Sequence, residues 1–324
     1  DFCVNPFDTQ LGCRFPTAEE LAFLNNFLLL LVTDPNKEIP EEGMTGLVQA
    51  VIQDMYMKTS EKGTPKRYDR GVDKKVDEIL DKLNVEIDYK TSWWEIVDIL
   101  FKNGYIHEAM LAQRNAVPLL ADAAGSAQDE KIRDIYGKII TSTGETLIQY
   151  FNRSITDALN QYKILGRPTV FDIGEARIVS LDLDEVAKSG GVQAQRQTAV
   201  MYMLARYILG KDFKLGPDSV NEMPYPSHIT PPESIPVKEY KAYHKKRIEE
   251  IKEDFKRLCF DEFHRTSSSP MVRNQVIVDM REGRKWNLDI TLASQSLEDF
   301  DETMKSFATG IFIMDGGNEK DINN

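Results

Sequence analysis

The chain has 324 residues, a length typical of about two domains. Hydrophobic residues make up 41% and charged residues 28% of the sequence, which excludes a chain that is mostly disordered, collagen-like or a coiled-coil rod. The formal net charge is −12, so the surface as a whole should repel nucleic acid and anionic lipid, whose phosphates bind to cations. A site for an anionic ligand would therefore be local and pre-formed.

Cysteine usage and hydropathy argue against metal clusters and membrane spans. The sequence has three cysteines and four histidines, and no two cysteines form a Cys-x-x-Cys pair. So few cysteines are typical of a reducing compartment. Cys259 lies in an apolar run and is predicted to be a buried core thiol. The longest apolar stretch, 21–32, is interrupted by Asn25 and Asn26 and is shorter than the ~20 residues that a membrane-spanning helix needs.

The N-terminal half is predicted to be helical after one short strand. Residues 2–5 form the strand candidate. The Thr-Ala-Glu-Glu sequence at 17–20 can form a capping box that starts the first helix, because its threonine and its last glutamate can bond reciprocally to the backbone. Helix then follows helix from about 34 to 166. Ser-Trp-Trp-Glu at 92–95 is a second capping box, and apolar residues spaced through 132–151 predict one long helix.

The C-terminal half alternates between strands and helices. Apolar strands that alternate with helices indicate a parallel sheet covered on both faces. The helical block is then an insertion into an α/β domain. The predicted elements are a strand at 176–183, a helix at 192–209, a proline-rich strap from 217 to 236, a helix at 238–255, a strand at 258–260, a helix at 270–282, a strand at 290–293, a helix from about 297 and a strand at 310–314.

One strand ends in a pair of acids. The stretch 257–264, Arg-Leu-Cys-Phe-Asp-Glu-Phe-His, has the pattern of a Walker B motif. The carboxyl end of a parallel strand faces the ligand crevice of the sheet. There Asp261 could hold Mg²⁺ through its water shell, and Glu262 could orient or deprotonate an attacking water. The pattern alone is common: a similar run occurs at 178–185, where we expect the acids to face water or cap a helix.

Two features downstream strengthen this interpretation. Gln295 stands at the end of the next predicted strand, where its amide could sense a γ-phosphate or the attacking water; the alternative is an ordinary polar strand end. Arg281, Arg284 and Lys285 precede that strand and could stabilise phosphoryl charge, within the chain or as an arginine finger across a subunit boundary. They could equally complement the dipole at a helix C-terminus.

The phosphate-binding loop of such a site does not occur in the sequence. There is no Gly-x-x-x-x-Gly-Lys-[Ser/Thr], and the glycine pairs at 190–191 and 316–317 lack the Lys–Ser/Thr sequel. The sequence begins at Asp1 rather than Met, so we interpret it as the C-terminal portion of an NTPase module whose P-loop lies upstream. Such a portion is not expected to hydrolyse ATP by itself.

Several stretches together resemble a known family. In order and spacing they are similar to the conjugation-type type IV secretion ATPases, above all to the DotO/IcmB group of the type IVB (Dot/Icm) systems. The similarity covers essentially the whole chain downstream of that family's P-loop. The stretches are 5–17 (Asn-Pro-Phe-Asp-Thr-Gln-Leu-Gly-Cys-Arg-Phe-Pro-Thr), the helical block, 258–264 (Leu-Cys-Phe-Asp-Glu-Phe-His), 281–285 (Arg-Glu-Gly-Arg-Lys) and 292–296 (Leu-Ala-Ser-Gln-Ser).

The resemblance implies an α/β fold, a RecA-like P-loop NTPase core with a large all-α insertion. Residues 1–36 would be the first part of the core, 37–165 the insertion, and 166–324 the rest of the core with the Walker B and sensor motifs. The activity implied is Mg²⁺-dependent ATP hydrolysis that drives assembly or export of effector substrates. The protein would be a hexamer-based homo-oligomer at the cytoplasmic face of the inner membrane, with other secretion ATPases such as DotB and inner-membrane components of the apparatus as partners.

The resemblance also implies roles for single residues. The implied site consists of Asp261 as the Mg²⁺ acid, Glu262 as the catalytic carboxylate, Gln295 as the sensor, Arg281 and Arg284 as catalytic cations and Lys285 as a nucleotide contact. The sequence departs from the family at two positions. Ser294 stands where a Thr often precedes the sensor and keeps the hydroxyl, whereas His264 replaces a frequent Trp and puts a ring-stacking role there in doubt.

Two alternatives stay open. One is a DNA-translocating motor of the same core, which the net charge of −12 disfavours, so that no specific binding of nucleic acid is expected. The other is a non-catalytic docking or scaffold module of the secretion apparatus, with the helical block as its working surface. Trp93 and Trp94 could then anchor a partner, although a position in the core is the simpler interpretation of both.

Overall fold

The computed structural model describes residues 3–37, 39–171, 176–182, 191–225, 237–267 and 270–314. The chain forms two compact units. The helical unit comprises Asp1–Ala176 and Asp218–Lys245, and the sheet unit comprises Arg177–Pro217 and Lys246–Asn324. The expected division grouped 1–36 with the nucleotide-binding core, whereas the structure groups these residues with the helical block. Among the described residues, no helix combines the length and the apolar content that crossing a membrane requires.

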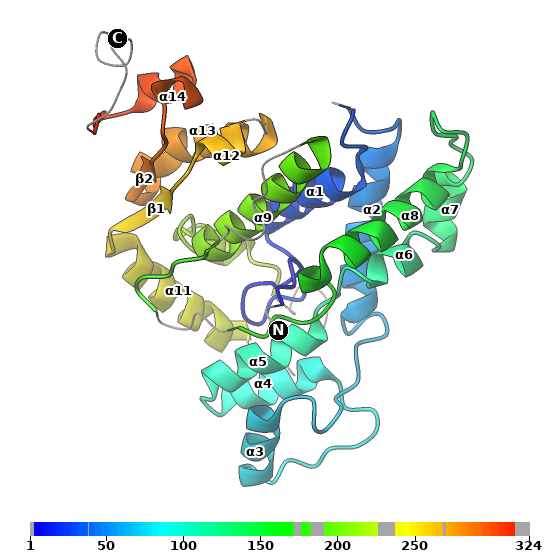
Figure 1. The fold of residues 1–324 in the computed structure, drawn as a ribbon. Coiled ribbons are helices and arrows are strands. Elements are labelled where there is room, and N and C mark those ends of the chain that lie inside the picture. The colour runs from blue at the N-terminus through cyan, green and yellow to red at the C-terminus, as the bar shows by residue number, and fades with distance from the viewer. Residues whose placement is uncertain are drawn as a thin grey trace. The chain divides into compact units, whose positions relative to one another are not determined.

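Short helices build the helical unit (Figure 1). They are α1 (Ala18–Val32), α2 (Met44–Thr59), α3 (Lys74–Lys82), α4 (Trp93–Lys102), α5 (Ile106–Ala116), α6 (Asp122–Ser126), α7 (Glu130–Tyr136), α8 (Leu147–Gln161), the 3₁₀ helix η1 (Lys163–Leu165) and α10 (Ser219–Glu222). Helices α1, α2, α6, α7 and α8 pack together, and α5 packs against α3 and α4. A further helix, α11 (Val237–Glu253), begins in the helical unit and ends in the sheet unit.

Both predicted capping boxes are confirmed. The Thr17 side chain accepts the Glu20 N–H at 3.3 Å, and the Glu20 carboxylate accepts the Thr17 N–H at 2.8 Å. Ser92 and Glu95 make the same reciprocal pair at the start of α4. Each box satisfies backbone N–H groups that the first turn of a helix leaves without an intrahelical partner. The two helices therefore begin where the local sequence places them.

The single long helix predicted through 132–151 is wrong. Helix α7 ends at Tyr136 and α8 begins at Leu147, and Thr146 caps α8. Between them Gly144 adopts a φ of +87°, a left-handed conformation that closes a turn and that an L side chain rarely adopts. Of the apolar residues that suggested one continuous helix, Ile135 and Ile140 are exposed, so the apolar spacing here did not mark a single buried helix face.

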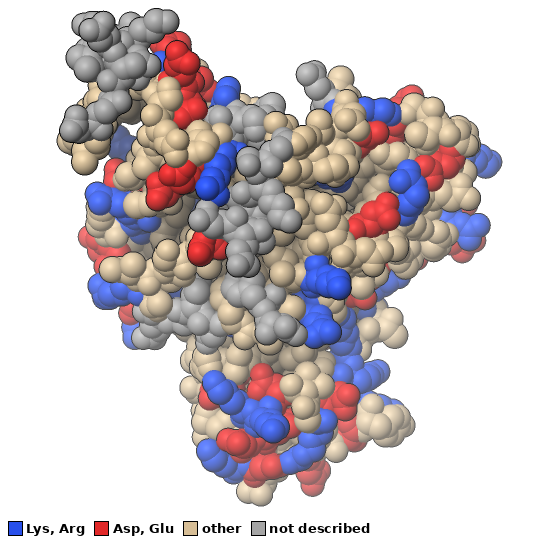
Figure 2. Space-filling model, viewed as in Figure 1, with Lys and Arg blue, Asp and Glu red and all other residues tan. Residues whose placement is uncertain are grey.

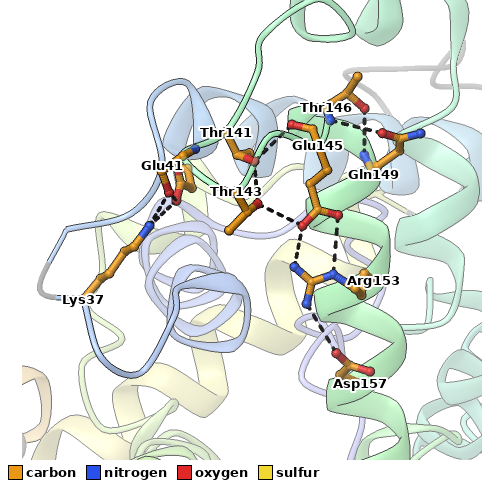
Figure 3. A network of polar contacts seen from close by, with 10 residues as sticks. Lys37, Glu41, Thr141, Thr143, Glu145, Thr146, Gln149, Arg153 and Asp157 are labelled. Carbon is orange, nitrogen blue, oxygen red and sulfur yellow. Dashed lines mark hydrogen bonds and ion pairs between the residues drawn. The ribbon is translucent and has the colours of Figure 1, made fainter.

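A polar network ties the turn between α7 and α8 to the connection between α1 and α2 (Figure 3). The Glu41 carboxylate accepts hydrogen bonds from Lys37 Nζ at 2.5 Å, from the Ser142 hydroxyl at 2.6 Å and from the Ser142 N–H at 3.0 Å. The hydrogen bonds from Lys37 and Ser142 lower the pKa of Glu41 to about 2. On the other side of the turn, Glu145 pairs with Arg153 of α8 at 2.6 Å.

One further expectation for the helical unit fails and another is confirmed. Residues 3–5 are buried but form no strand, and the Val4 N–H donates to the carbonyl of Ile164 at 2.8 Å. The tryptophans proposed as partner anchors belong to the core, as the simpler interpretation held. Trp94 is 1% exposed and donates its indole N–H to the Thr59 carbonyl at 2.9 Å, and Trp93 is 3% exposed.

In the described part of the sheet unit two strands are present and they are parallel, which confirms the strands predicted at 258–260 and 290–293. Strand β1 (Lys256–Phe260) runs beside β2 (Leu288–Leu292), in register from Lys256 opposite Leu288 to Phe260 opposite Leu292. The other elements of this unit are α9 (Val192–Gly210), α12 (His264–Ser267), α13 (Pro270–Glu282), η4 (Gly283–Trp286), η5 (Leu297–Asp299) and α14 (Glu302–Phe307). Helix α13 packs against α9, β2 and α14.

The sheet is smaller and more open than expected. Residues 176–182 and 310–314 form no strand, and Phe312 and Met314 are largely exposed. Exposure alternates along β1, so that Cys259 is exposed, and the prediction of a buried thiol is wrong. One face of β1 is therefore covered in the described part of the unit, rather than both. The acids at 184–185, the strap residues 226–236 and the Gly-Gly at 316–317 lie outside the described residues.

Candidate functional site

The carboxyl ends of β1 and β2 meet at one edge of the sheet (Figure 1). Beyond the strands the backbone hydrogen bonds continue. The Ala293 N–H donates to the carbonyl of Phe260 at 2.9 Å, and the Phe263 N–H donates to the carbonyl of Ala293 at 2.9 Å. The two loops that leave the strands are therefore held side by side, at the edge where open parallel sheets bind their ligands.

These loops bring two of the predicted site residues into contact. The side-chain amide of Gln295 donates to Glu262 Oε2 at 3.0 Å. Asp261 and Gln295 are exposed and Glu262 is half-buried, so all three can be reached from solvent. A buried acid pair, or a glutamine on the far side of the sheet, would have contradicted the motif interpretation. The structure shows neither arrangement.

The backbone at Glu262 is left-handed, with a φ of +51°. This conformation costs a residue with a side chain on the order of 1 kcal/mol, so the surrounding contacts must hold it. The Asp261 carboxylate accepts the Glu262 N–H at 2.9 Å, and the Tyr202 hydroxyl donates to the Asp261 carbonyl at 3.2 Å. Phe263, the next residue, is fully buried. The sharp bend places the two acids outside the sheet while the chain turns back into the core.

Three contributors to the site were missed or undervalued in the sequence. His264 Nδ1 lies 3.3 Å from Glu262 Oε2, so the imidazole ring lies beside the carboxylate. Tyr202 comes from α9 and has no motif of its own. Asp299 accepts hydrogen bonds from the loop that carries Gln295. The Ser-Leu-Glu-Asp sequence at 296–299, a capping pattern, was the signal that could have pointed to Asp299.

The residues at this edge fit a Mg²⁺ ion that a nucleotide brings with it. Magnesium commonly takes one or two protein carboxylates and completes its shell with waters and phosphate oxygens. Asp261 offers an exposed carboxylate of this kind. In the described part of the chain, no three His, Cys, Asp or Glu side chains gather into a metal cage. A metal held by protein ligands alone therefore has no basis in these residues.

The basic cluster lies at the opposite end of β2. Arg281 is in the last turn of α13, and Arg284 and Lys285 lie in η4, just before the strand begins. Five strand residues, about 17 Å, separate this end from the loop that carries Gln295. All three cations are exposed, and Arg281 stacks over the Phe307 ring at 5.3 Å. The structure therefore does not bring the cluster to Glu262 of the same chain.

The comparisons with known proteins leave the chain without an assigned family. No protein-family model matches it, and neither the curated proteins nor the solved structures contain a significant match.

Proposed function

We propose that this chain belongs to a Mg²⁺-dependent ATPase with a RecA-like core, of the kind that powers type IV secretion. The observation that carries the proposal is the 3.0 Å hydrogen bond from Gln295 to Glu262. It joins the loops after two adjacent parallel strands, where a sensor amide and a catalytic carboxylate are needed together. The order of the motifs along the chain supports the assignment to secretion ATPases of the Dot/Icm type.

Each side chain at the sheet edge has a distinct part in this proposal. Glu262 accepts a proton from the attacking water, and its Oε2 is held by the Gln295 amide. Gln295 can pass a change at the γ-phosphate to Glu262 because its side-chain amide donates to that carboxylate. Asp261 would hold Mg²⁺ through its water shell, and a bound Mg²⁺ would supply neutralisation of the phosphate charge.

The basic cluster acts across a subunit boundary in this proposal. A hexamer-based ring places one subunit's surface against the nucleotide edge of its neighbour, and the exposed Arg281, Arg284 and Lys285 are available for that contact. Their distance from Glu262 in their own chain favours action in trans over action in cis. Oligomerisation, attachment to the inner-membrane face and contacts with other secretion ATPases are proposed from the motif resemblance.

The surface charge favours a protein substrate over DNA. The net charge of −12 opposes general binding to a phosphate backbone. On the face drawn in Figure 2, the described Lys and Arg side chains are interspersed with Asp and Glu and form no broad basic area. A DNA-translocating motor of the same core is therefore the less favoured alternative.

The test is the Mg²⁺-dependent ATP turnover of the whole protein that contains this chain. We expect Glu262→Gln to lower turnover by about 10²–10⁴-fold, the range typical of losing a general base, while nucleotide still binds. Glu298→Gln is the matched control, because Glu298 is an exposed carboxylate on the nearby η5. Wild-type turnover in Glu262→Gln would remove the residue from catalysis, and a whole protein without ATP turnover would refute the ATPase proposal.

A further inference from the structure

A carboxylate outside the motifs holds the loop on which Gln295 lies. Asp299 Oδ2 accepts the Ser294 hydroxyl at 2.6 Å and the Ser296 N–H at 3.2 Å. Ser294 and Ser296 are the two chain neighbours of Gln295. Both neighbours are therefore tied to one oxygen atom, and the backbone of Gln295 is fixed between them. Hydrogen bonds to a charged carboxylate are stronger than bonds between neutral groups.

Ser294 also connects Asp299 to the loop that carries Glu262. The Ser294 hydroxyl oxygen accepts a hydrogen bond from the backbone N–H of His264 at 3.0 Å. A hydroxyl has one proton, so a hydroxyl that donates to Asp299 must receive the His264 N–H on its oxygen. Asp299 thus orients the Ser294 hydroxyl in the direction that joins the two loops. Without Asp299, the hydroxyl could rotate toward other acceptors.

An aromatic contact joins the same two loops beside these hydrogen bonds. Phe263 and Phe300 stack with their ring centroids 5.8 Å apart and their planes within 8°. Phe263 directly follows Glu262, and Phe300 directly follows Asp299. The stack and the hydrogen bonds therefore join the same two loops through neighbouring residues. Replacing Asp299 alone would leave the contact between Phe263 and Phe300 in place. The loops should therefore stay folded while the Gln295 side chain loses its fixed orientation.

We propose that Asp299 is a positioning residue that, through Ser294, holds the Gln295 amide against Glu262. The effect on turnover rests on the proposed ATPase function, whereas the effect on the Gln295 side chain does not. A glutamine side-chain amide gives two proton signals in any state, because rotation about its C–N bond is slow; a hydrogen bond shifts the signal of the donated proton and slows its exchange with water. These signals, assigned by their disappearance in Gln295→Ala, report on the orientation of Gln295 without any nucleotide.

The experiment compares Asp299→Ala with Asp299→Asn by NMR and by ATP turnover of the whole protein. Asparagine keeps a side-chain oxygen that can accept from Ser294, so Asp299→Asn should keep the wild-type shift and slow exchange of the Gln295 amide protons. In Asp299→Ala the hydrogen-bonded signal should move to the position of a solvent-exposed glutamine amide and exchange faster with water. There kcat should also fall by about 10–100-fold with little change in KM, because misplaced catalytic groups lose rate rather than binding. Glu298→Ala is the control, since Glu298 contributes only its backbone N–H to this loop.

Unchanged Gln295 signals in a folded Asp299→Ala would overturn the proposal, and so would shifted, fast-exchanging signals with wild-type turnover. If Asp299→Ala does not fold, Ser294→Ala and Ser294→Thr replace it, because only threonine keeps the hydroxyl between Asp299 and His264. Shifted, fast-exchanging signals in a whole protein that has no ATP turnover would leave the positioning of Gln295 confirmed and refute the ATPase function instead.

Discussion

The side chains of Gln295 and Glu262 meet at 3.0 Å although 33 positions separate them in the sequence. Each residue follows one of two adjacent parallel strands, and the register of β1 and β2 brings both to one edge of the sheet. A contact of this kind makes the two residues act as one unit, and this predicts how their substitutions combine.

Gln295→Ala should lower the ATP turnover of the whole protein by about 10–100-fold, because it removes a donor that orients the catalytic carboxylate. In a Glu262→Gln background the same substitution should cost little more, since residues that act as a unit are not additive. Steady-state turnover of the two single variants and the double variant measures this. Gln53→Ala, an exposed glutamine on α2, is the control. Independent, multiplicative losses would contradict the coupling.

The position of the basic cluster predicts complementation between subunits. Glu262→Gln and Arg284→Ala should each lack turnover, because each removes a different part of the composite site. Mixed before assembly, the two variants should regain turnover, since some interfaces then pair an intact Glu262 with an intact Arg284. Lys246→Ala, which alters a cation whose side chain is 81% exposed in the same unit, should be active alone. A mixture no more active than its components would exclude action in trans.

The buried Arg14 predicts a large loss of stability when one of its partners is removed. Its side chain is fully buried, with Asp98 at 2.7 Å and Glu61 at 2.5 Å. Burial opposes the charged form of Arg14, but the two acids outweigh it and hold the pKa above its ordinary value. Asp98→Ala should lower the free energy of unfolding by about 3 kcal/mol, because a buried charge loses a partner.

Urea unfolding at neutral pH measures this loss of stability. Asp81→Ala is the matched control: Asp81 pairs with Arg70 at 2.5 Å, but both side chains are about 60% exposed. An exposed pair of this kind contributes less than about 1 kcal/mol. If Asp98→Ala and Asp81→Ala lowered the free energy of unfolding equally, the burial of Arg14 would not be the cause of the loss in Asp98→Ala.

The hydrogen bonds around Glu41 predict a contribution to the free energy of unfolding that is lost in acid. Its pKa is lowered from an ordinary 4.5 to about 2, so the folded state favours the charged carboxylate. The stabilisation is therefore fully present above about 4.5 and is lost as the pH falls toward about 2. Glu41→Gln should be less stable than the wild type by less than about 1 kcal/mol at pH 7, because the network lies at the surface.

The difference between Glu41→Gln and the wild type should shrink between about pH 4.5 and pH 2, as measured by chemical denaturation at a series of pH values. Glu42→Gln is the control, since Glu42 is an exposed neighbour. This variant removes a neighbouring carboxylate and leaves the hydrogen bonds of Glu41 in place. A Glu41→Gln difference that does not change with pH would contradict the lowered pKa.

Several features of the fold could be predicted because their causes are local. Helix starts at Thr17 and Ser92 depend on bonds that span three residues, so short sequence patterns predict them reliably. The strands that became β1 and β2 were predicted from apolar runs next to polar ends. The break between α7 and α8 escaped prediction because apolar spacing suggested one buried helix face, whereas Ile135 and Ile140, which precede Gly144, are exposed.

By itself, the sequence determined the helix starts, the two paired strands and the acid pair with a glutamine one strand later. Only the tertiary structure decided that Gln295 touches Glu262, that the basic cluster lies at the other end of β2, that Asp299 holds the loop and that Cys259 is exposed. The reason is physical: a helix cap is complete within one turn, whereas exposure of a strand and contacts between loops depend on which segments pack beside them.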